Sequence, residues 1–166
     1  DVLLGEIHRA LARPPRLLYA IFVDFRAAFD SGSRSLALRL LAEAGIPLKI
    51  LGLFKAILQE NRVDIDDGVT IRRGFTQTTG FAQGENTSPI LFSVLVGRLP
   101  ARISEKHPFV KTIMNADDLV MTSTSRFHLQ QAVATLDNFI TDLGLPINEE
   151  KTVAMKFRKG GPLARN

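Results

Sequence analysis

Residues 17–25 form the stretch Leu-Leu-Tyr-Ala-Ile-Phe-Val-Asp-Phe. Every residue in it except Asp24 is apolar or aromatic. A short continuous apolar run rich in strand-forming residues predicts a central β-strand that is buried on both faces. The run is far shorter than the roughly 20 apolar residues that a helix needs to cross a bilayer. We therefore expect a sheet built around residues 17–25, and no association with a membrane.

Helices and strands alternate irregularly on either side of this strand. Apolar spacing predicts helices over residues 1–12, 33–45, 47–58, 88–99 and 125–144. Strands are predicted over residues 63–65, 69–71, 109–114, 119–122 and 152–157. Several of these strands follow one another as hairpins, which excludes a regularly alternating parallel sheet. The pattern predicts an α+β fold, an antiparallel sheet with helices packed on one face.

Local signals mark where several of these helices begin and end. Ser33, Ser88 and Ser125 are predicted N-caps, because a serine oxygen can accept a hydrogen bond from an unpaired backbone N–H. Pro100 is expected to kink or end the helix that starts near Ser88. Asp66 and Asp67 precede a glycine between two strands, and we interpret them as ordinary turn residues.

Length and composition limit the class of protein. The chain has 166 residues, of which 45% are hydrophobic and 23% charged, values typical of one folded globular domain. There is no cysteine, so neither a disulfide scaffold nor a thiolate metal site can form. A chain without cysteine also fits a reducing compartment, and the expected location is intracellular, either nuclear or cytoplasmic.

The charge balance gives a mild preference for polyanionic partners. Lysine and arginine number 21 against 17 acidic residues, a formal net charge of +4. The basic residues gather in three groups: Arg13 with Arg16, Arg72 with Arg73, and Lys156 with Arg158 and Lys159. Each group alone is explained equally well as a solvated basic surface.

Three carboxylates are hard to explain by packing. Asp24 ends the buried strand, while Asp117 and Asp118 lie between two apolar strands in a tight turn. A carboxylate in such a setting is costly unless a cation or hydrogen bonds compensate its charge. Carboxylates without nearby His or Cys favour Mg²⁺ or Mn²⁺. Two such ions about 4 Å apart form the phosphoryl-transfer clamp of polymerases and nucleases.

Four segments, in order, resemble the motifs of reverse transcriptases, most closely those of non-LTR (LINE-type) retrotransposons. Residues 22–30 read Phe-Val-Asp-Phe-Arg-Ala-Ala-Phe-Asp and residues 80–92 read Gly-Phe-Ala-Gln-Gly-Glu-Asn-Thr-Ser-Pro-Ile-Leu-Phe. Residues 115–118 read Asn-Ala-Asp-Asp and residues 144–152 read Gly-Leu-Pro-Ile-Asn-Glu-Glu-Lys-Thr. The resemblance covers nearly the whole chain and implies the palm of a right-hand polymerase with part of the fingers.

The resemblance implies a role for each matching residue. Asp24 and Asp117 would be the main ligands of two Mg²⁺ ions, with Asp118 a nearby carboxylate and the carbonyl of Phe25 a further ligand. The reaction implied is attack of a DNA primer 3′-hydroxyl on a dNTP, so that the primer is extended as a copy of an RNA template. Lys151 is the candidate general acid for pyrophosphate, although a lysine after two glutamates also suits a solvated surface.

Further residues would contact the nucleotide. Phe29 matches the family's sugar gate, a bulky ring that collides with a ribose 2′-hydroxyl, and it could otherwise be a core aromatic. Gln83 would line the nucleotide pocket, and Gly84 would let the backbone approach the base or template. Arg26 would meet the triphosphate or water.

The chain also departs from the family pattern. Asn115 stands where the family has Tyr or Phe beside the primer end, and Thr87 stands where Leu is usual. We expect residues 1–160 to be a palm with partial fingers and residues 161–166 to be a tail or linker. The upstream fingers and the thumb would then belong to the rest of a parent polyprotein.

Other functions fit part of the sequence. A polymerase-derived scaffold without activity, binding RNA or protein, is the main alternative, and Asn115 supports it. An RNA-recognition module with a similar sheet would present aromatic residues on its central strands, where this chain has Ile113, Met114, Val120 and Met121. An RNA-dependent RNA polymerase is disfavoured by Phe29 as a gate against ribose.

Overall fold

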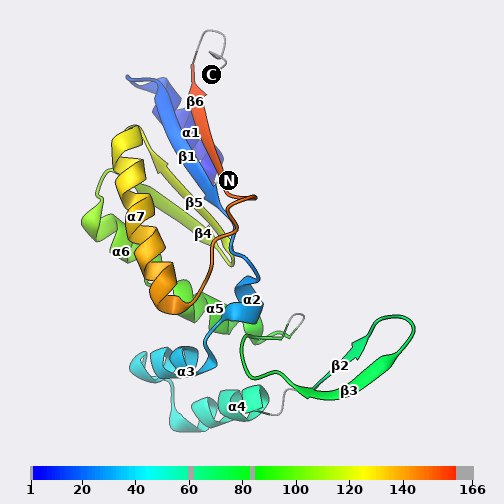
Figure 1. Cartoon of the computed structure of the whole chain (residues 1–166). Coiled ribbons are helices and arrows are strands. Elements are labelled where there is room, and N and C mark those ends of the chain that lie inside the picture. The colour runs from blue at the N-terminus through cyan, green and yellow to red at the C-terminus, as the bar shows by residue number, and fades with distance from the viewer. Residues whose placement is uncertain (1, 60–61, 83–84, 160–166) are drawn as a thin grey trace. The chain divides into compact units, whose positions relative to one another are not determined.

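The computed structural model describes residues 2–59, 62–82 and 85–159, shown as a cartoon in Figure 1. They form two compact units. Among the described residues, the sheet unit comprises residues 2–26, 98–141 and 147–159, and the helical unit comprises residues 27–59, 62–82, 85–97 and 142–146. Within the described residues, no helix combines the length and the apolar character needed to span a membrane. The predicted tail at residues 161–166 lies outside the described part of the chain.

The sheet unit is built on a four-stranded antiparallel sheet. Its strands are β1 (Leu17–Val23), β4 (Lys111–Asn115), β5 (Asp118–Ser123) and β6 (Val153–Arg158). The strand order is β4-β5-β1-β6, so β1 is hydrogen-bonded on both sides. The predicted central strand and the predicted α+β class are therefore confirmed. The long apolar run suits this inner position, because side chains on both faces of a central strand can be covered by other elements.

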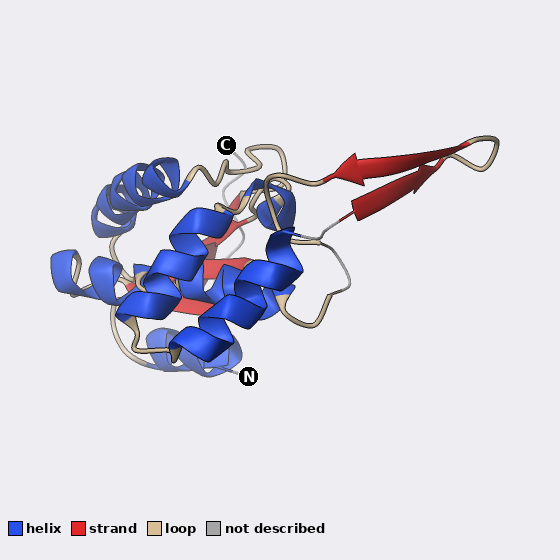
Figure 2. Cartoon of the chain, turned by 90° about the horizontal axis from the view of Figure 1, so that it is seen from below, coloured by secondary structure: helices blue, strands red, loops and turns tan. Residues whose placement is uncertain are grey.

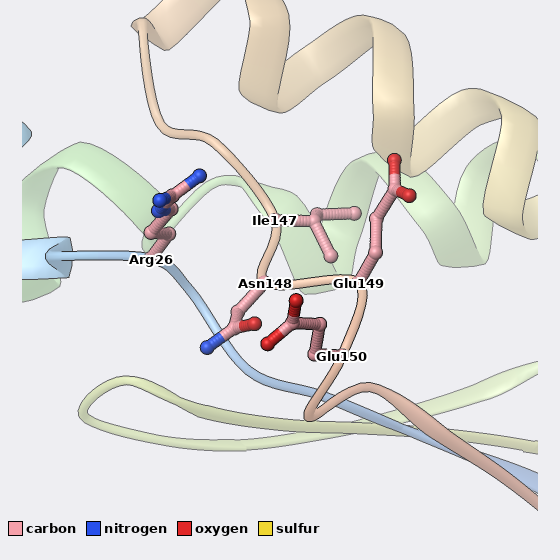
Figure 3. A pocket seen from close by; sticks show the side chains of 5 residues that line it. All are labelled: Arg26, Ile147, Asn148, Glu149 and Glu150. Atoms are coloured by element: carbon pink, nitrogen blue, oxygen red, sulfur yellow. The ribbon is translucent and has the colours of Figure 1, made fainter.

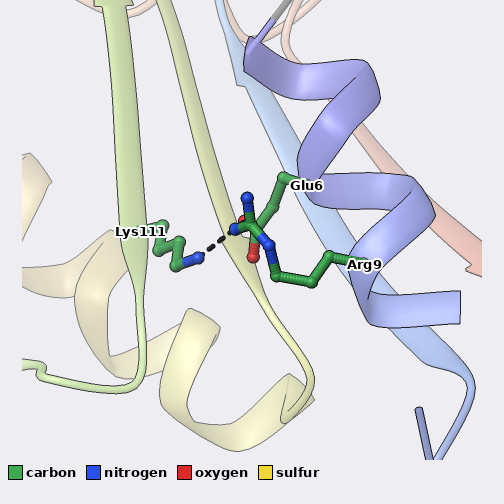
Figure 4. Close-up of polar contacts among 3 residues, drawn as sticks. All are labelled: Glu6, Arg9 and Lys111. Carbon is green, nitrogen blue, oxygen red and sulfur yellow. Dashed lines mark hydrogen bonds and ion pairs between the residues drawn. The ribbon is translucent and has the colours of Figure 1, made fainter. Parts of the chain in front are cut away.

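Helices cover both faces of this sheet, whereas the sequence predicted one covered face. Leu18 and Ala20 are fully buried on one face. Helix α1 (Val2–Ala12) lies over that face, because its Glu6 forms an ion pair of 2.6 Å with Lys111 of β4 (Figure 4). Lys111 lies opposite Thr122 and Thr122 opposite Ala20, so all three side chains share this face.

The opposite face is covered by α6 (Leu99–Lys106) and α7 (Arg126–Leu143). Leu119 and Met121 of β5 are fully buried there. Figure 1 shows α7 in front of the sheet and α1 behind it. A central strand that is apolar on both faces needs cover on both, which is the physical reason for the second layer.

The helical unit contains four helices and a hairpin in its described part. The helices are α2 (Ala28–Ser31), α3 (Arg34–Glu43), α4 (Leu48–Gln59) and α5 (Ser88–Val96). Phe81, Leu91 and Phe92 are fully buried and form its core. A hairpin forms as predicted, from β2 (Arg62–Asp66) paired with β3 (Ile71–Thr76), and Figure 2 shows it as a long two-stranded ribbon. Its second strand begins at Ile71, where the predicted strand over residues 69–71 was expected to end.

Two of the three predicted N-caps are confirmed. The Ser33 hydroxyl accepts a hydrogen bond of 3.3 Å from the Leu36 N–H, and the Ser125 hydroxyl accepts one of 3.4 Å from the His128 N–H. Ser88 is not a cap, because its hydroxyl donates to the Ala82 carbonyl at 2.6 Å and the N-cap position falls on Thr87.

The region of Pro100 also differs from the prediction. Helix α5 ends at Val96, before the proline, and Pro100 lies in the first turn of the separate helix α6. A proline is accommodated there because the first N–H groups of a helix have no partner within the helix. The helices α2 and α6 were not predicted from the sequence.

Candidate active site

Asp24 follows the last residue of β1 and is held in place through its backbone. Its N–H donates to the Thr152 hydroxyl oxygen at 3.3 Å, and its carbonyl accepts a hydrogen bond of 2.8 Å from the Asn148 N–H. The next residue, Phe25, forms an antiparallel bridge with Ile147. The segment at residues 147–152 therefore fixes the chain where β1 ends, and the half-buried Asp24 side chain starts from a defined position.

Asp117 and Asp118 lie at the hairpin that joins β4 to β5. Asn115 pairs with Asp118, which leaves Ala116 and Asp117 as a two-residue turn. Ala116 adopts a left-handed conformation with φ of 53°, as tight hairpin turns require at one or both central positions. The turn leaves both carboxylates exposed at the end of the hairpin.

The sheet register brings Asp24 and Asp118 together. Val23 pairs with Leu119, so the next residues outward, Asp24 and Asp118, are neighbours across the ends of two adjacent strands. Both residues line one open hollow of 400 Å³, together with Lys151. Two of the carboxylates that the sequence singled out thus lie at one site, and Asp117 is adjacent to it in the chain.

The donor chemistry of this hollow suits Mg²⁺ when substrate phosphates complete the shell. Among the described residues, no three His, Asp or Glu side chains are placed to hold a metal ion by themselves. Mg²⁺ is usually bound through one or two carboxylates plus water and substrate phosphates, rather than by an all-protein cage. Asp24 and Asp118 supply carboxylate oxygens of that kind from two strands.

Arg26 lies in a neighbouring hollow of a different character. It lines a pocket of 490 Å³ with Ile147, Asn148, Glu149 and Glu150, and Figure 3 shows these five side chains. Four of them come from the segment that is hydrogen-bonded to the Asp24 backbone. Two carboxylates beside one guanidinium weaken the attraction for a triphosphate. A contact between Arg26 and the nucleotide stays a prediction.

Of the remaining predicted nucleotide contacts, only Phe29 lies among the described residues, in the helical unit. The Phe29 ring is half-buried and lies 5.2 Å from the Phe92 ring, centroid to centroid. The Phe29 carbonyl accepts a hydrogen bond of 2.7 Å from the Phe81 N–H. Phe29 is therefore anchored against the core of its unit, and its role as a sugar gate stays a prediction. Gln83 and Gly84 lie outside the described residues.

Two structural residues, one in each unit, were not identified from the sequence. Thr152, whose hydroxyl accepts from the Asp24 N–H, lies in the last of the four motifs, but the motif itself implies no role for it. Arg34 at the start of α3 donates from Nε to the Gly80 carbonyl and from Nη1 to the Leu58 carbonyl, both at 2.6 Å. It also donates to the Gln77 carbonyl. Nothing in the sequence marks Arg34, because its partners are backbone atoms distant in the chain.

The environment of Arg34 is unfavourable to its charge. Burial removes water from the guanidinium and lowers its pKa, and the negative charge of Glu85 opposes this effect. Arg34 stays charged in any case, since its ordinary pKa is far above neutrality. The residue therefore acts as a charged clamp on the segment that leads to residues 83 and 84.

Solved structures of similar shape define the class of fold. Telomerase from Candida Tropicalis, in complex with a TWJ fragment of telomeric RNA, superposes with a TM-score of 0.75 over 93% of this chain and 29% of its own, at 14% identity. Telomerase from Candida albicans gives a TM-score of 0.69 over 92% of this chain and 30% of its own, at 13% identity. The fold is that of a right-hand polymerase.

The family model for reverse transcriptase (RNA-dependent DNA polymerase) matches residues 3–160. The chain therefore belongs to the reverse transcriptase family, as the four motifs suggested.

The similar curated proteins come from retrotransposable elements. The Pol polyprotein of the element R2DM of Drosophila melanogaster is 27% identical over 94% of this chain, and that of the R2 element of Nasonia vitripennis is 24% identical over 81%. A 115 kDa protein of the element R1DM of Drosophila melanogaster is 29% identical over 82%. The chain spans between 13% and 15% of the length of these three proteins.

Proposed function

We propose that this chain is the polymerase core of a non-LTR retrotransposon reverse transcriptase. Its substrates are an RNA template, a DNA primer and dNTPs, and the remaining fingers and the thumb of the parent polyprotein complete the enzyme. The observation that carries the proposal is the hollow in which Asp24 and Asp118 meet at the ends of two paired strands. Family membership makes nucleotidyl transfer the chemistry to test there.

In the proposed reaction, the primer 3′-hydroxyl oxygen forms a bond to the α-phosphorus of the dNTP and pyrophosphate leaves. Asp24, Asp117 and the Phe25 carbonyl would hold two Mg²⁺ ions, with Mn²⁺ as a substitute and Asp118 taking a smaller share. Such ions lower the pKa of the attacking hydroxyl and offset the charge that builds up on the phosphate.

The chain's own residues position these groups. Thr152 and Asn148 fix the Asp24 backbone, so the carboxylate needs little reorganisation when substrate arrives. Lys151 is exposed and lines the same hollow, which suits it to donate a proton to the departing pyrophosphate. Its backbone N–H donates to the Asn148 carbonyl at 3.2 Å, so the lysine starts from an ordered turn.

Primer extension by the complete polyprotein tests this proposal. Asp24→Asn and Asp117→Asn should each lower the Mg²⁺-dependent rate by at least about 100-fold, because each removes part of a metal site that supplies several kcal/mol. Asp66→Asn, an exposed turn aspartate in the hairpin of the helical unit, is the matched control and should extend normally. Extension that survives Asp24→Asn or Asp117→Asn refutes the two-metal assignment.

One observation favours a second function. Asn115, at the end of β4, is exposed beside the catalytic turn, where the family pattern has an aromatic ring. An inactive scaffold that binds RNA or protein would tolerate this change. A complete polyprotein that binds RNA but extends no primer with either Mg²⁺ or Mn²⁺ would support the scaffold.

A further inference from the structure

A second hollow lies at the other end of the sheet unit. It has a volume of 340 Å³ and is lined by Tyr19 and Lys156 from β1 and β6 and by Arg126 and Leu129 from α7, among other residues. Tyr19 and Lys156 lie opposite each other in the register, and the Lys156 ammonium lies 5.7 Å from the centroid of the Tyr19 ring. The hollow thus combines aromatic and aliphatic surface from Tyr19 and Leu129 with the positive charge of Lys156.

The charges around this hollow are of one sign. Its lining includes Arg126 and Lys156, both exposed, and no acidic residue. Neither cation forms an ion pair with a carboxylate within the described residues. Arg158 follows Lys156 by two positions and so shares its face of β6. A hydrogen bond of 3.3 Å from the Lys159 N–H to the Arg16 carbonyl brings one more basic pair to this end of the sheet.

This site is separate from the carboxylates. Side chains alternate along a strand, so Tyr19 points to the face opposite Phe22 and the two hollows open on different faces. Asp24 also lies five positions after Tyr19 along extended chain, which puts their Cα atoms about 17 Å apart. A nucleotide that reacts at Asp24 does not reach the second hollow, and the Lys156 group of basic residues has no part in the proposed reaction.

The chemistry of the hollow suits an RNA strand. Grooves that hold single-stranded nucleic acid combine cations for the phosphates with aromatic or aliphatic surface for sugars and bases. We propose that the hollow lined by Tyr19, Arg126 and Lys156 is an accessory contact for the phosphodiester backbone of single-stranded RNA. The contact holds RNA away from the reacting nucleotide and does not depend on catalysis at Asp24.

Salt-dependent binding tests this site. Fluorescence anisotropy of a short labelled single-stranded RNA would compare the 166-residue chain with the double variant Arg126→Gln/Lys156→Gln. Each phosphate contact in single-stranded nucleic acid contributes about 0.7 to the slope of log K against log salt. We expect the double variant to make this negative slope shallower by about 1.4. Its affinity at low salt should fall by about tenfold or more.

A matched control distinguishes loss of this site from a general loss of positive charge. Lys49→Gln/Lys55→Gln removes the same charge from exposed positions of α4, and it should change the affinity by less than about twofold. Equal losses in the two double variants, or an unchanged slope for Arg126→Gln/Lys156→Gln, would overturn the proposal. Thermal unfolding of all variants checks the fold. Normal primer extension at saturating template, by the complete polyprotein carrying Arg126→Gln/Lys156→Gln, would show that any loss is one of RNA affinity.

Discussion

Arg34 offers the sharpest stability prediction, because its guanidinium joins three backbone carbonyls from separate segments. These are the carbonyls of Leu58, Gln77 and Gly80. A hydrogen bond from a charged donor contributes about 1.5–3 kcal/mol, and its loss leaves an acceptor without that partner. We take the low end of this range for each of the three bonds and subtract the desolvation cost of the guanidinium, which Arg34→Met removes. The expected loss in the free energy of unfolding is then about 3 kcal/mol.

Arg39→Met is the matched control for this prediction. Arg39 lies on the same helix, its side chain is 69% exposed, and its Nε lies 3.9 Å from the Glu43 carboxylate. Exposed pairs of this kind contribute little, so the control should lose less than about 0.5 kcal/mol. Urea denaturation at 25 °C measures both variants.

Hydrogen exchange identifies where the Arg34 effect occurs. The Gly80 N–H bonds the Gly32 carbonyl at 3.0 Å and the Phe81 N–H bonds the Phe29 carbonyl at 2.7 Å, so these amides report on the clamped segment. They should exchange about 100-fold faster in Arg34→Met if the segment opens with a free energy lowered by about 3 kcal/mol. Exchange and urea stability equal to those of Arg39→Met would refute the reasoning.

Three further predictions follow from single contacts. In urea denaturation, Gly80→Ala should lower the free energy of unfolding by at least about 2 kcal/mol more than Gly68→Ala. Both glycines have positive φ, but only at Gly80 would a Cβ lie 2.3 Å from a backbone oxygen. Equal losses would contradict this. Thr152→Val should lower kcat of primer extension with little change in KM, and Thr152→Ser should restore it, because only the hydroxyl accepts from Asp24; a serine variant as slow as the valine variant would exclude that role. Phe29→Ala should let the polyprotein incorporate ribonucleotides, and unchanged discrimination between dNTP and rNTP would refute the sugar gate.

Features set by local sequence were predicted well. The apolar run of residues 17–25 identified the central strand, and Ser33 and Ser125 marked true helix starts, because strand burial and capping depend on near neighbours. Ser88 was misassigned because its hydroxyl bonds the Ala82 carbonyl, an interaction set by the path of the preceding loop. The second helical layer was missed because a sequence pattern shows that α1 has an apolar side, but not which face it covers.

The candidate site divides in the same way. Asp24 and Asp118 were singled out because charged residues at the ends of apolar strands conflict with packing, and the register places them side by side. Asp118 is exposed, however, so packing does not explain it, and the catalytic role of both residues stays a prediction. Thr152 was not singled out, because its partner is a backbone group far away in the chain. The same reason hid Arg34, which belongs to the helical unit and not to this site. Residues that hold a site through such contacts carry no compositional signal.

Locating the metal ions tests the central claim most directly. Crystals of the complete polyprotein with primer–template, a non-hydrolysable dNTP and Mn²⁺ would show bound manganese by anomalous scattering. We expect two peaks about 4 Å apart, with Asp24 and Asp117 as ligands of both and Asp118 close by. Peaks that avoid Asp24 and Asp117, or carboxylates more than about 10 Å apart in the substrate complex, would contradict the assignment of this chain as a two-metal polymerase core.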